Sequence, residues 1–438
     1  MTPSARLQAV IDILQGLDAT AQPADRFLRD WFRARRYAGS KDRAAVSERT
    51  YAILRHRSSF AWQMDSKDAR ALVIASLLAD GLPADAIAEL FDGKGYGPPA
   101  LTDAERIAIP SPPREEAPLH VRGEFPPFLE AELARAFGPA LLDEMLALQS
   151  RAPVDLRVNT LKSSRATVLE ALHAEGFDAA PIRYSPFAIR LASGEGAGKL
   201  SASSLFLDGA FEFQDEAAQI ASLLCGAAPG MRVLDFAAGA GGKSLALAAQ
   251  MKNTGEIVAH DITAARLKAL APRAARAGAT IIQTCTDLSA PALAGEVASV
   301  ASRRGAFDIV LVDAPCSGTG TWRRQPELRW RITPESLASV RALQDNLLEQ
   351  GAAFVKPGGR LIYATCSILP SENEDRIEGF RARHADFRTL SAAEIWRSVS
   401  ATPPPGMDRF FKATPLTTAT DGFFAAILQR WTSPAASG

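Results

Sequence analysis

The stretch that decides the fold is Phe307 to Gly320, FDIVLVDAPCSGTG, in which an apolar run leads directly into a Pro-Cys-Ser-Gly turn. A second stretch of the same plan is Gly359 to Ser367, GRLIYATCS. Each apolar run predicts a buried strand of a parallel sheet. Ligands of open α/β sheets bind at the carboxyl ends of such strands. We therefore expect Cys316 and Cys366 to face one crevice, one as a nucleophile and the other as its partner.

The chain around these two stretches alternates apolar strand runs with helical segments, from about residue 214 to residue 431. Such alternation predicts βαβ units, a mostly parallel sheet and an α/β fold class. The last run should be a closing strand at the end of the sheet. The further expected strands are 232–236, 256–260, 280–283 and 422–428.

The bulk composition describes an ordinary globular protein of two or three domains, with 438 residues, 47% apolar and 22% charged. No apolar run is long enough to span a membrane and no signal peptide is visible, so we expect a cytoplasmic protein without a membrane partner. The four cysteines are too scattered for a disulfide framework or a metal site. A net charge of +0 argues against unselective coating of nucleic acid, although a local basic face is compatible with it.

The amino-terminal part is helical by its apolar spacing, from about residue 5 to residue 90, and two of its helices are rich in arginine. These arginines form either a solvated face or a stripe that faces phosphates. Prolines between residues 93 and 127 are too dense for a helix or a central strand. We place a helical domain with its Pro-rich linker at 1–126, a small α+β module at 127–213 and the α/β domain at 214–432.

A glycine-rich turn, Gly239 to Ser244 (GAGGKS), follows the expected strand that ends near Asp235 and opens a helix. The turn fits neither the P-loop pattern nor GxGxxG. It still suits a nucleotide-like cofactor, because Asp261 ends the next strand, where a carboxylate accepts from ribose hydroxyls, and Asp287 follows the third strand. Cys225, Cys285 and His260 are expected to be structural. The predicted cofactor-binding residues are Ala237, Ala238, Gly239, Ala240, Gly241, Gly242, Lys243, Asp261, Arg266, Asp287 and Asp313.

The residues together resemble the Sun/RsmB-type RNA cytosine-5 methyltransferases. The resemblance is carried by 235–243, by the two cysteine motifs, by Glu372-Asn373-Glu374, and by the lead-in segments 156–159 and 214–219. The helical domain, with segments 42–43 and 51–57, resembles the NusB-like RNA-binding domain of bacterial RsmB members. The chain departs from the family pattern at Ala237 and Ala240 in the glycine-rich turn, and at Gln325, where the family has His.

This resemblance implies a Rossmann-like, S-adenosylmethionine-dependent methyltransferase domain joined to a small α+β module and an all-α NusB-like domain. It implies covalent catalysis in which Cys366 adds to C6 of a cytosine, Cys316 assists its release and Asp313 holds the base edge. The substrate would be RNA, small-subunit ribosomal RNA by analogy, and the protein a monomer. The expected RNA contacts are Arg157, Asn159, Arg323, Arg324 and Arg329.

Other functions remain open on the residues alone. A DNA cytosine methyltransferase would use the Pro-Cys thiol as its nucleophile and would not need the Thr365-Cys366 motif. A non-catalytic RNA-binding or assembly factor would not need both cysteines, and a small-molecule methyltransferase would not need two appended domains. A tRNA substrate is the alternative to ribosomal RNA.

Overall fold

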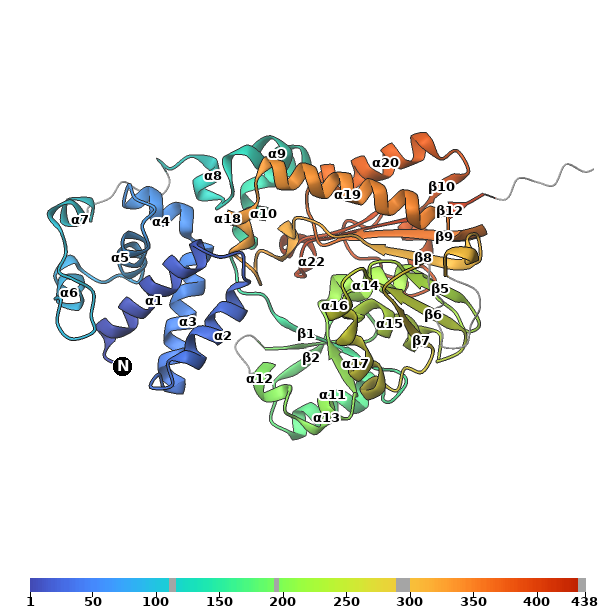
Figure 1. The fold of residues 1–438 in the computed structure, drawn as a ribbon, viewed down its shortest axis with the longest axis horizontal. Helices are drawn as coiled ribbons and strands as arrows, with labels where there is room; N and C mark the ends of the chain where they lie inside the picture. The colour runs from blue at the N-terminus through green and yellow to red at the C-terminus, as the bar shows by residue number, and fades with distance from the viewer. Residues whose placement is uncertain (110–115, 193–196, 289–299, 432–438) are drawn as a thin grey trace, which may run out of the picture. The chain divides into compact units, whose positions relative to one another are not determined.

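The computed structural model describes residues 1–109, 116–192, 197–288 and 300–431, which form two compact units (Figure 1). The first unit comprises Met1–Arg151 and Thr321–Ile332, and the second comprises Ala152–Gly320 and Thr333–Gly438. Domain boundaries at 126/127 and 213/214 stay a prediction. None of the helices in these described ranges is both long and apolar enough to cross a membrane.

The first unit is all-helical, and most of its helices form where the apolar spacing predicts them. The Pro-rich segment 93–127 was expected to contain no helix, but it holds two short ones, Asp103–Ala108 and Leu119–Arg122, which form because neither contains a proline. In the first helix, Pro3 occupies the opening turn and the Thr2 hydroxyl accepts a hydrogen bond from Ala5 N, a standard N-cap. Its inner face buries Leu7, Ile11 and Leu14 in the unit's core. The helices are α1 (Pro3–Asp18), α2 (Ala24–Ala34), α3 (Ser40–Arg55), α4 (Arg57–Gln63), α5 (Ala69–Ala79), α6 (Ala84–Leu90), α7 (Asp103–Ala108), α8 (Leu119–Arg122), α9 (Glu130–Phe137) and α10 (Leu141–Ala147).

The segment Thr321–Ile332 leaves the second unit directly after the Pro-Cys motif and packs within the first unit. It carries the short helix α18 (Leu328–Arg331). Its Arg329 side chain is fully buried and donates to the carbonyl oxygens of Arg55 and Leu148 at 3.2 Å each. The segment therefore belongs to the helical core although it lies far away in sequence.

A small antiparallel sheet opens the second unit, in the order β2-β3-β1-β4. Buried side chains of β1, such as Leu156 and Val158, contact Val168 and Leu172 from the helix that follows. The elements are β1 (Val154–Val158), α11 (Arg165–Ala174), β2 (Ala179–Pro181), β3 (Ala188–Leu191), α12 (Ala197–Leu200), α13 (Ser204–Leu207) and β4 (Phe211–Phe213).

The large sheet of the second unit has the order β10-β12-β9-β8-β5-β6-β7, with β11 paired to β12. The strands from β9 to β7 in that order are parallel to one another, which confirms the predicted α/β class with a Rossmann-like sheet. The strands are β5 (Arg232–Asp235), β6 (Glu256–His260), β7 (Ile282–Cys285), β8 (Phe307–Asp313), β9 (Val355–Thr365), β10 (Phe387–Leu390), β11 (Phe411–Ala413) and β12 (Phe423–Arg430).

The prediction that the last strand closes the end of the sheet is wrong in one respect. The last strand, β12, pairs antiparallel with β9 on one side and with β10 and β11 on the other, so it is an interior strand. The edge strand is β10, whose residues Phe387–Leu390 are too short and too polar to predict a strand from their pattern.

Alternating side chains of the strands point to opposite faces, and helices cover both faces (Figure 1). On β8, Ile309 and Leu311 join the core with α14 and α15, whereas Val310 and Val312 join the core with α19 and α20. The covering helices are α14 (Glu216–Leu224), α15 (Gly242–Gln250), α16 (Ala264–Lys268), α17 (Leu270–Ala277), α19 (Pro334–Ala352), α20 (Glu374–Arg383), α21 (Ala392–Trp396) and α22 (Pro415–Thr418).

Candidate active site

Two thiols meet at the carboxyl ends of the neighbouring parallel strands β8 and β9. Cys316 follows β8 and Cys366 follows β9, and their Sγ atoms lie 3.3 Å apart, within hydrogen-bonding distance. Both residues are half-buried, whereas Cys225 and Cys285 are buried in the core, as their patterns predict. Parallel pairing of β8 with β9 thus creates a thiol pair from residues 50 positions apart.

Main-chain hydrogen bonds hold the two cysteine loops together. Gly320 N donates to the carbonyl oxygen of Cys366 at 2.9 Å, and Gly422 N donates to the carbonyl oxygen of Gly320 at 2.9 Å. A Cβ atom at Gly320 would lie 2.0 Å from the carbonyl oxygen of Gly422. The glycine of the Pro-Cys motif is therefore needed because two backbones touch there.

A buried carboxylate, Glu372, links the same two loops through hydrogen bonds. It accepts hydrogen bonds from Ser317 N at 2.8 Å, from Ser367 Oγ at 2.5 Å, from the Ser317 hydroxyl, and from Gln344 Nε2 at 3.0 Å. Ser317 and Ser367 each directly follow one of the cysteines. Glu372 therefore determines where both thiols lie relative to each other.

The surroundings of Cys316 affect its protonation. The hydrogen bond shared with Cys366, together with burial and the nearby Glu372 carboxylate, raises the pKa of Cys316 well above its ordinary value. Cys316 therefore keeps its proton in the free protein. A thiol that keeps its proton is a poor nucleophile.

An ion pair lies at the start of the Pro-Cys loop. Lys243 Nζ donates to Asp313 Oδ2 at 2.6 Å, and the ammonium lies 5.0 Å from the ring centre of Phe423. Burial lowers the pKa of Lys243, but the charges of Asp313, Asp235 and Cys366 outweigh this effect and raise it. Lys243 is therefore a fixed positive charge that interacts with the Asp313 carboxylate and with the Cys366 thiol.

The glycine-rich turn from Ala237 to Lys243 lies at the switch point between β5 and β8, where the strand order reverses. Gly241 adopts a left-handed conformation with φ of 79° and caps the amino end of α15. At Gly239, with φ of 57°, an added Cβ would meet no atom within 4 Å, so the space beside the turn is open. Open space, glycine backbone and a helix N-terminus suit a nucleoside cofactor.

Asp261 organises this turn as well as ending β6. Its Oδ2 accepts from Gly239 N at 3.0 Å, and its Oδ1 accepts from Thr263 N at 2.8 Å. Arg266 lies 3.9 Å from the same carboxylate. Asp287 is exposed beyond the end of β7. The predicted cofactor residues of the turn and Asp261 are thus brought together, and these residues fit the group.

Two of the residues predicted to contact RNA form hydrogen bonds inside the protein instead. Arg157 is buried and donates to Gln214 Oε1 at 2.5 Å and to the carbonyl oxygen of Gly242 at 2.7 Å. Asn159 is buried and donates to the carbonyl oxygens of Gly209 and Ala277. These hydrogen bonds attach the small sheet to the cofactor turn and to α17, so they account for the two side chains without RNA.

The remaining predicted RNA contacts lie on the segment Thr321–Ile332. Arg329 is the fully buried residue described above, and its guanidinium lies 4.7 Å from the ring centre of Trp322. Arg323 is buried and Arg324 is exposed. Of the five residues, Arg324 alone has an exposed side chain. Nothing in the local sequence indicates that Arg323 and Arg329 are buried.

Sequence reasoning missed Glu372 and Gln344 as site residues. Glu372 is part of the Glu372-Asn373-Glu374 segment that supported the family resemblance. The sequence of that segment does not predict that the Glu372 carboxylate accepts hydrogen bonds from both Ser317 and Ser367. Gln344 lies in the long helix α19 and donates both to Glu372 and to the carbonyl oxygen of Pro315. A buried glutamine on an otherwise amphipathic helix is a weak signal that could have been followed.

Comparison with known proteins places the chain among ribosomal RNA methyltransferases. Residues 224–429 match the family described as 16S rRNA methyltransferase RsmB/F, and residues 125–196 match the RsmF/B-like ferredoxin-like domain. The probable ribosomal RNA small subunit methyltransferase B of Synechocystis sp. is 33% identical over 319 residues, which cover 72% of this chain and 69% of that protein. Its namesake in Bacillus subtilis is 30% identical over 75% of this chain and 72% of that protein.

Two solved structures resemble the whole chain or its larger part. The crystal structure of PH0851 matches with a TM-score of 0.74 and 25% identity, over 98% of this chain and 99% of that one. A methyltransferase homologue from Pyrococcus horikoshii matches with a TM-score of 0.59 and 25% identity, over 71% of this chain and 97% of that one.

Proposed function

Because the chain belongs to the RsmB/F family of 16S rRNA methyltransferases, we propose that it methylates C5 of a cytosine in small-subunit ribosomal RNA through a covalent adduct. Family membership makes it an S-adenosylmethionine-dependent methyltransferase, in agreement with the predicted cofactor. When bound, S-adenosylmethionine supplies the methyl group as an electrophile. The observation that carries the proposal is the thiol pair at the ends of β8 and β9 beside the Asp313–Lys243 ion pair.

Cys366 is the nucleophile in this proposal. Cytosine C5 is too weak a nucleophile to take a methyl group directly, and addition of a thiolate at C6 turns the C5 carbon into an enamine-like donor. Lys243 carries the positive charge that interacts with Cys366. The raised pKa of Cys316 makes that thiol a poor nucleophile, so the role of nucleophile falls to Cys366.

Asp313 contacts the base during the addition of the Cys366 thiolate, and Cys316 acts in the release of Cys366 after methyl transfer. Once C5 carries the methyl group, a base must take the C5 proton; the C5–H electron pair then forms the C5=C6 double bond, and the C6–S bond breaks to expel Cys366 as a thiolate. When Cys366 is bonded to C6, its hydrogen bond and charge no longer raise the pKa of Cys316, and Cys316, whose Sγ lies 3.3 Å from Cys366 Sγ in the free protein, can lose its proton to water and serve as that base. Asp313 has one carboxylate oxygen held by Lys243. Its other oxygen is available to the N3 and amino edge of the base, where it would compensate charge as the adduct forms.

Bound cofactor would be held by the turn from Gly239 to Lys243 and by the Asp261 region. The target base must enter unpaired, because C6 of a stacked and paired cytosine is out of reach of a protein thiol. Recognition of an unpaired segment is also how proteins read RNA sequence most often.

Bisulfite sequencing of ribosomal RNA tests this function directly. A strain without the protein should lose 5-methylcytosine at one or more positions of its small-subunit RNA. Wild-type protein should restore the modification, and the Cys366→Ala variant should not. Unchanged 5-methylcytosine in the deletion strain, or restoration by Cys366→Ala, would contradict the proposal.

A further inference from the structure

Two arginines bind the backbone of the glycine-rich turn. Nη1 of Arg157 donates to the carbonyl oxygen of Gly242 at 2.7 Å, and Nη1 of Arg273 donates to the carbonyl oxygen of Ala240 at 2.5 Å. Arg157 belongs to β1 of the small sheet, and Arg273 belongs to α17. The turn is therefore held by two elements that lie outside the β5–turn–α15 segment to which it belongs.

The hydrogen bond from Arg157 also fixes a donor on the opposite side of the same peptide. The C=O and N–H groups of one trans peptide point in opposite directions, so the arginine that holds the Gly242 carbonyl sets the direction of the Lys243 N–H. Lys243 lies in the first turn of α15, where N–H groups have no partner within the helix. Arg157 thus orients a backbone donor that a cofactor can use.

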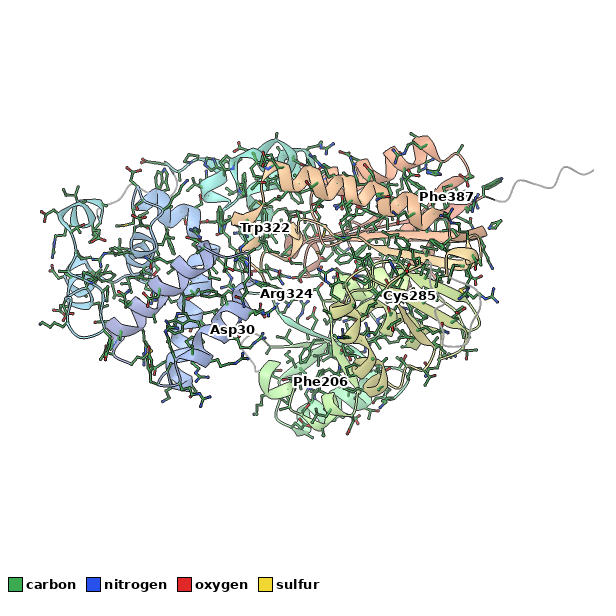
Figure 2. The ribbon with its side chains drawn as sticks, viewed as in Figure 1. Asp30, Phe206, Cys285, Trp322, Arg324 and Phe387 are labelled. Carbon is green, nitrogen blue, oxygen red and sulfur yellow. The ribbon has the colours of Figure 1, made fainter. Side chains whose placement is uncertain are left out.

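A buried carboxylate, Glu212, holds the arginines together. Glu212 lies on β4 directly opposite Arg157, and its side chain accepts from Arg273 Nη2 at 2.9 Å and from Arg276. The guanidinium of Arg276 lies 3.8 Å from the ring centre of Phe206, which Figure 2 labels. Burial lowers the pKa of Arg157 to about 10 and the Glu212 charge counteracts this effect, so Arg157 is charged at neutral pH.

Helix α17 packs closely against both the small sheet and the turn, and Figure 1 shows it beside the small sheet. A Cβ atom at Gly209 would lie 2.0 Å from the carbonyl oxygen of Arg276. A Cβ atom at Gly241 would lie 2.1 Å from Cδ1 of Leu270. Contacts this close leave no room for the small sheet to shift without a shift of α17 and of the turn.

We propose that Arg157 and Arg273, held together by Glu212, are positioning residues for S-adenosylmethionine, and that the small sheet is therefore part of the cofactor site. The arginines act through the backbone of the turn and do not touch the cofactor. The proposal rests on the S-adenosylmethionine dependence stated under the proposed function and not on which atom of the RNA is methylated. It gives Arg157, which the sequence suggested as an RNA contact, a role in binding the cofactor.

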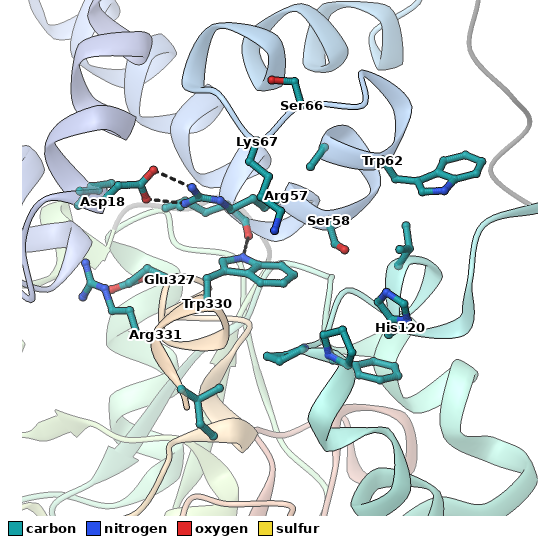
Figure 3. A pocket seen from close by; sticks show the side chains of 18 of the residues that line it. Asp18, Arg57, Ser58, Trp62, Ser66, Lys67, His120, Glu327, Trp330 and Arg331 are labelled. Carbon is teal, nitrogen blue, oxygen red and sulfur yellow. Dashed lines mark hydrogen bonds and ion pairs between the residues drawn. The ribbon is translucent and has the colours of Figure 1, made fainter. Parts of the chain in front are cut away.

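Calorimetry of S-adenosylmethionine binding to the full-length protein, without RNA, tests the proposal. Arg157→Met and Arg273→Met keep the length of the side chain and remove its donors, and each should weaken binding about tenfold. Arg57→Met is the matched control, because Arg57 donates two hydrogen bonds of 2.7 Å to Asp18 in the helical unit (Figure 3). Its affinity for S-adenosylmethionine should equal that of the wild type.

Lysine variants distinguish the two arginines and keep the comparison available if a methionine variant fails to fold. Both hydrogen bonds of Arg157 come from the single nitrogen Nη1, so one ammonium can replace them in part. Arg273 uses Nη1 for Ala240 but Nε and Nη2 for Glu212, a fork that one ammonium cannot reproduce. Arg157→Lys should therefore recover part of the lost affinity, whereas Arg273→Lys should bind as weakly as Arg273→Met.

Two further measurements separate positioning from a general loss of stability. Backbone amides of residues 237–245 should exchange hydrogen faster in the cofactor-free methionine variants, while the other strands of the large sheet keep their protection. In methylation assays the KM for S-adenosylmethionine should rise about tenfold, with kcat at saturating cofactor within about twofold of the wild type. A protein that is merely less stable would instead lose calorimetric stoichiometry and kcat at an unchanged Kd.

The proposal is overturned if both methionine variants bind S-adenosylmethionine with wild-type affinity, if exchange in the turn is unchanged, or if only the stoichiometry falls. None of these results bears on the proposed cytosine chemistry, because binding is measured without RNA. A wild-type protein that binds the cofactor but leaves ribosomal RNA without 5-methylcytosine would contradict the proposed function, and the roles of the two arginines would still be decided by calorimetry.

Discussion

Replacing Glu372 by Gln should weaken both the fold and the chemistry, because one carboxylate holds both cysteine loops. Glu372 is fully buried and accepts four hydrogen bonds, from Ser317 N, Ser317 Oγ, Ser367 Oγ and Gln344 Nε2. A hydrogen bond to a charged group contributes about 1.5–3 kcal/mol and a neutral one about 0.5–1.5 kcal/mol. Loss of about 1 kcal/mol for each bond, with incomplete additivity, predicts that the second unit becomes less stable by about 2–4 kcal/mol.

The variant should also methylate more slowly. Displacement of a reacting group by about 1 Å can reduce a rate on the order of a hundredfold, so we expect single-turnover methylation to fall between about tenfold and a hundredfold. The pKa of Cys316, raised by the Cys366 hydrogen bond, by burial and also by the Glu372 charge, should move down toward its ordinary value. The pH dependence of Cys316 alkylation, followed by peptide mass spectrometry, measures this shift, which a purely structural defect would not produce.

Glu374→Gln is the matched control, because it lies two residues away and its carboxylate forms a surface ion pair with Lys412. Its effect on stability should stay within about 1 kcal/mol. If Glu372→Gln unfolds at the wild-type denaturant concentration and methylates at the wild-type rate, the carboxylate does not position the loops.

Three further changes test other parts of the structure. Asp261→Ala should weaken S-adenosylmethionine binding about tenfold in calorimetry, because the carboxylate holds Gly239 N; equal affinity would remove Asp261 from the site. Gly320→Ala should cost more than about 3 kcal/mol, since its Cβ would lie 2.0 Å from the Gly422 carbonyl oxygen, whereas Gly198→Ala meets no atom within 4 Å; equal melts would contradict the contact. Burial raises the pKa of Asp235 from 3.8 to about 7, so its contribution to stability is complete below pH 3.8 and is lost as pH rises through about 7. Urea unfolding should therefore show a decline in stability over that window, which Asp235→Asn flattens; an unchanged slope would refute the assignment.

The large sheet could be predicted from sequence because its strands are buried and apolar on both faces. The runs that end in Asp313 and Thr365 lie where expected, and their parallel pairing brings the two cysteines together. The edge strand β10 escaped prediction because an exposed edge needs no apolar pattern. Because β10 was not predicted, β12 was expected to be the last strand of the sheet, whereas it lies between β10 and β9.

The fine structure of the site could not be predicted, because it depends on contacts between distant segments. Glu372 and Ser317 are 55 positions apart, and no local pattern records their hydrogen bond. Arg157 and Asn159 were predicted to contact RNA because their side chains are hydrogen-bond donors. In the folded protein, these donors bind carbonyl oxygens of the protein itself. Arg329 shows the same limit, since its partners, the carbonyl oxygens of Arg55 and Leu148, lie far from it in sequence although all three residues belong to the first unit.

The most direct test of the account is covalent trapping of RNA by the two cysteine variants. Small-subunit ribosomal RNA is incubated with S-adenosylmethionine and with Cys316→Ala or Cys366→Ala protein, and the products are separated on a denaturing gel. Cys316→Ala should methylate once and remain covalently joined to the RNA, because Cys366 can attack but is not expelled. Cys366→Ala should bind RNA reversibly and transfer no methyl group. A trapped complex with Cys366→Ala, or none with Cys316→Ala, would contradict the assignment of the two thiols.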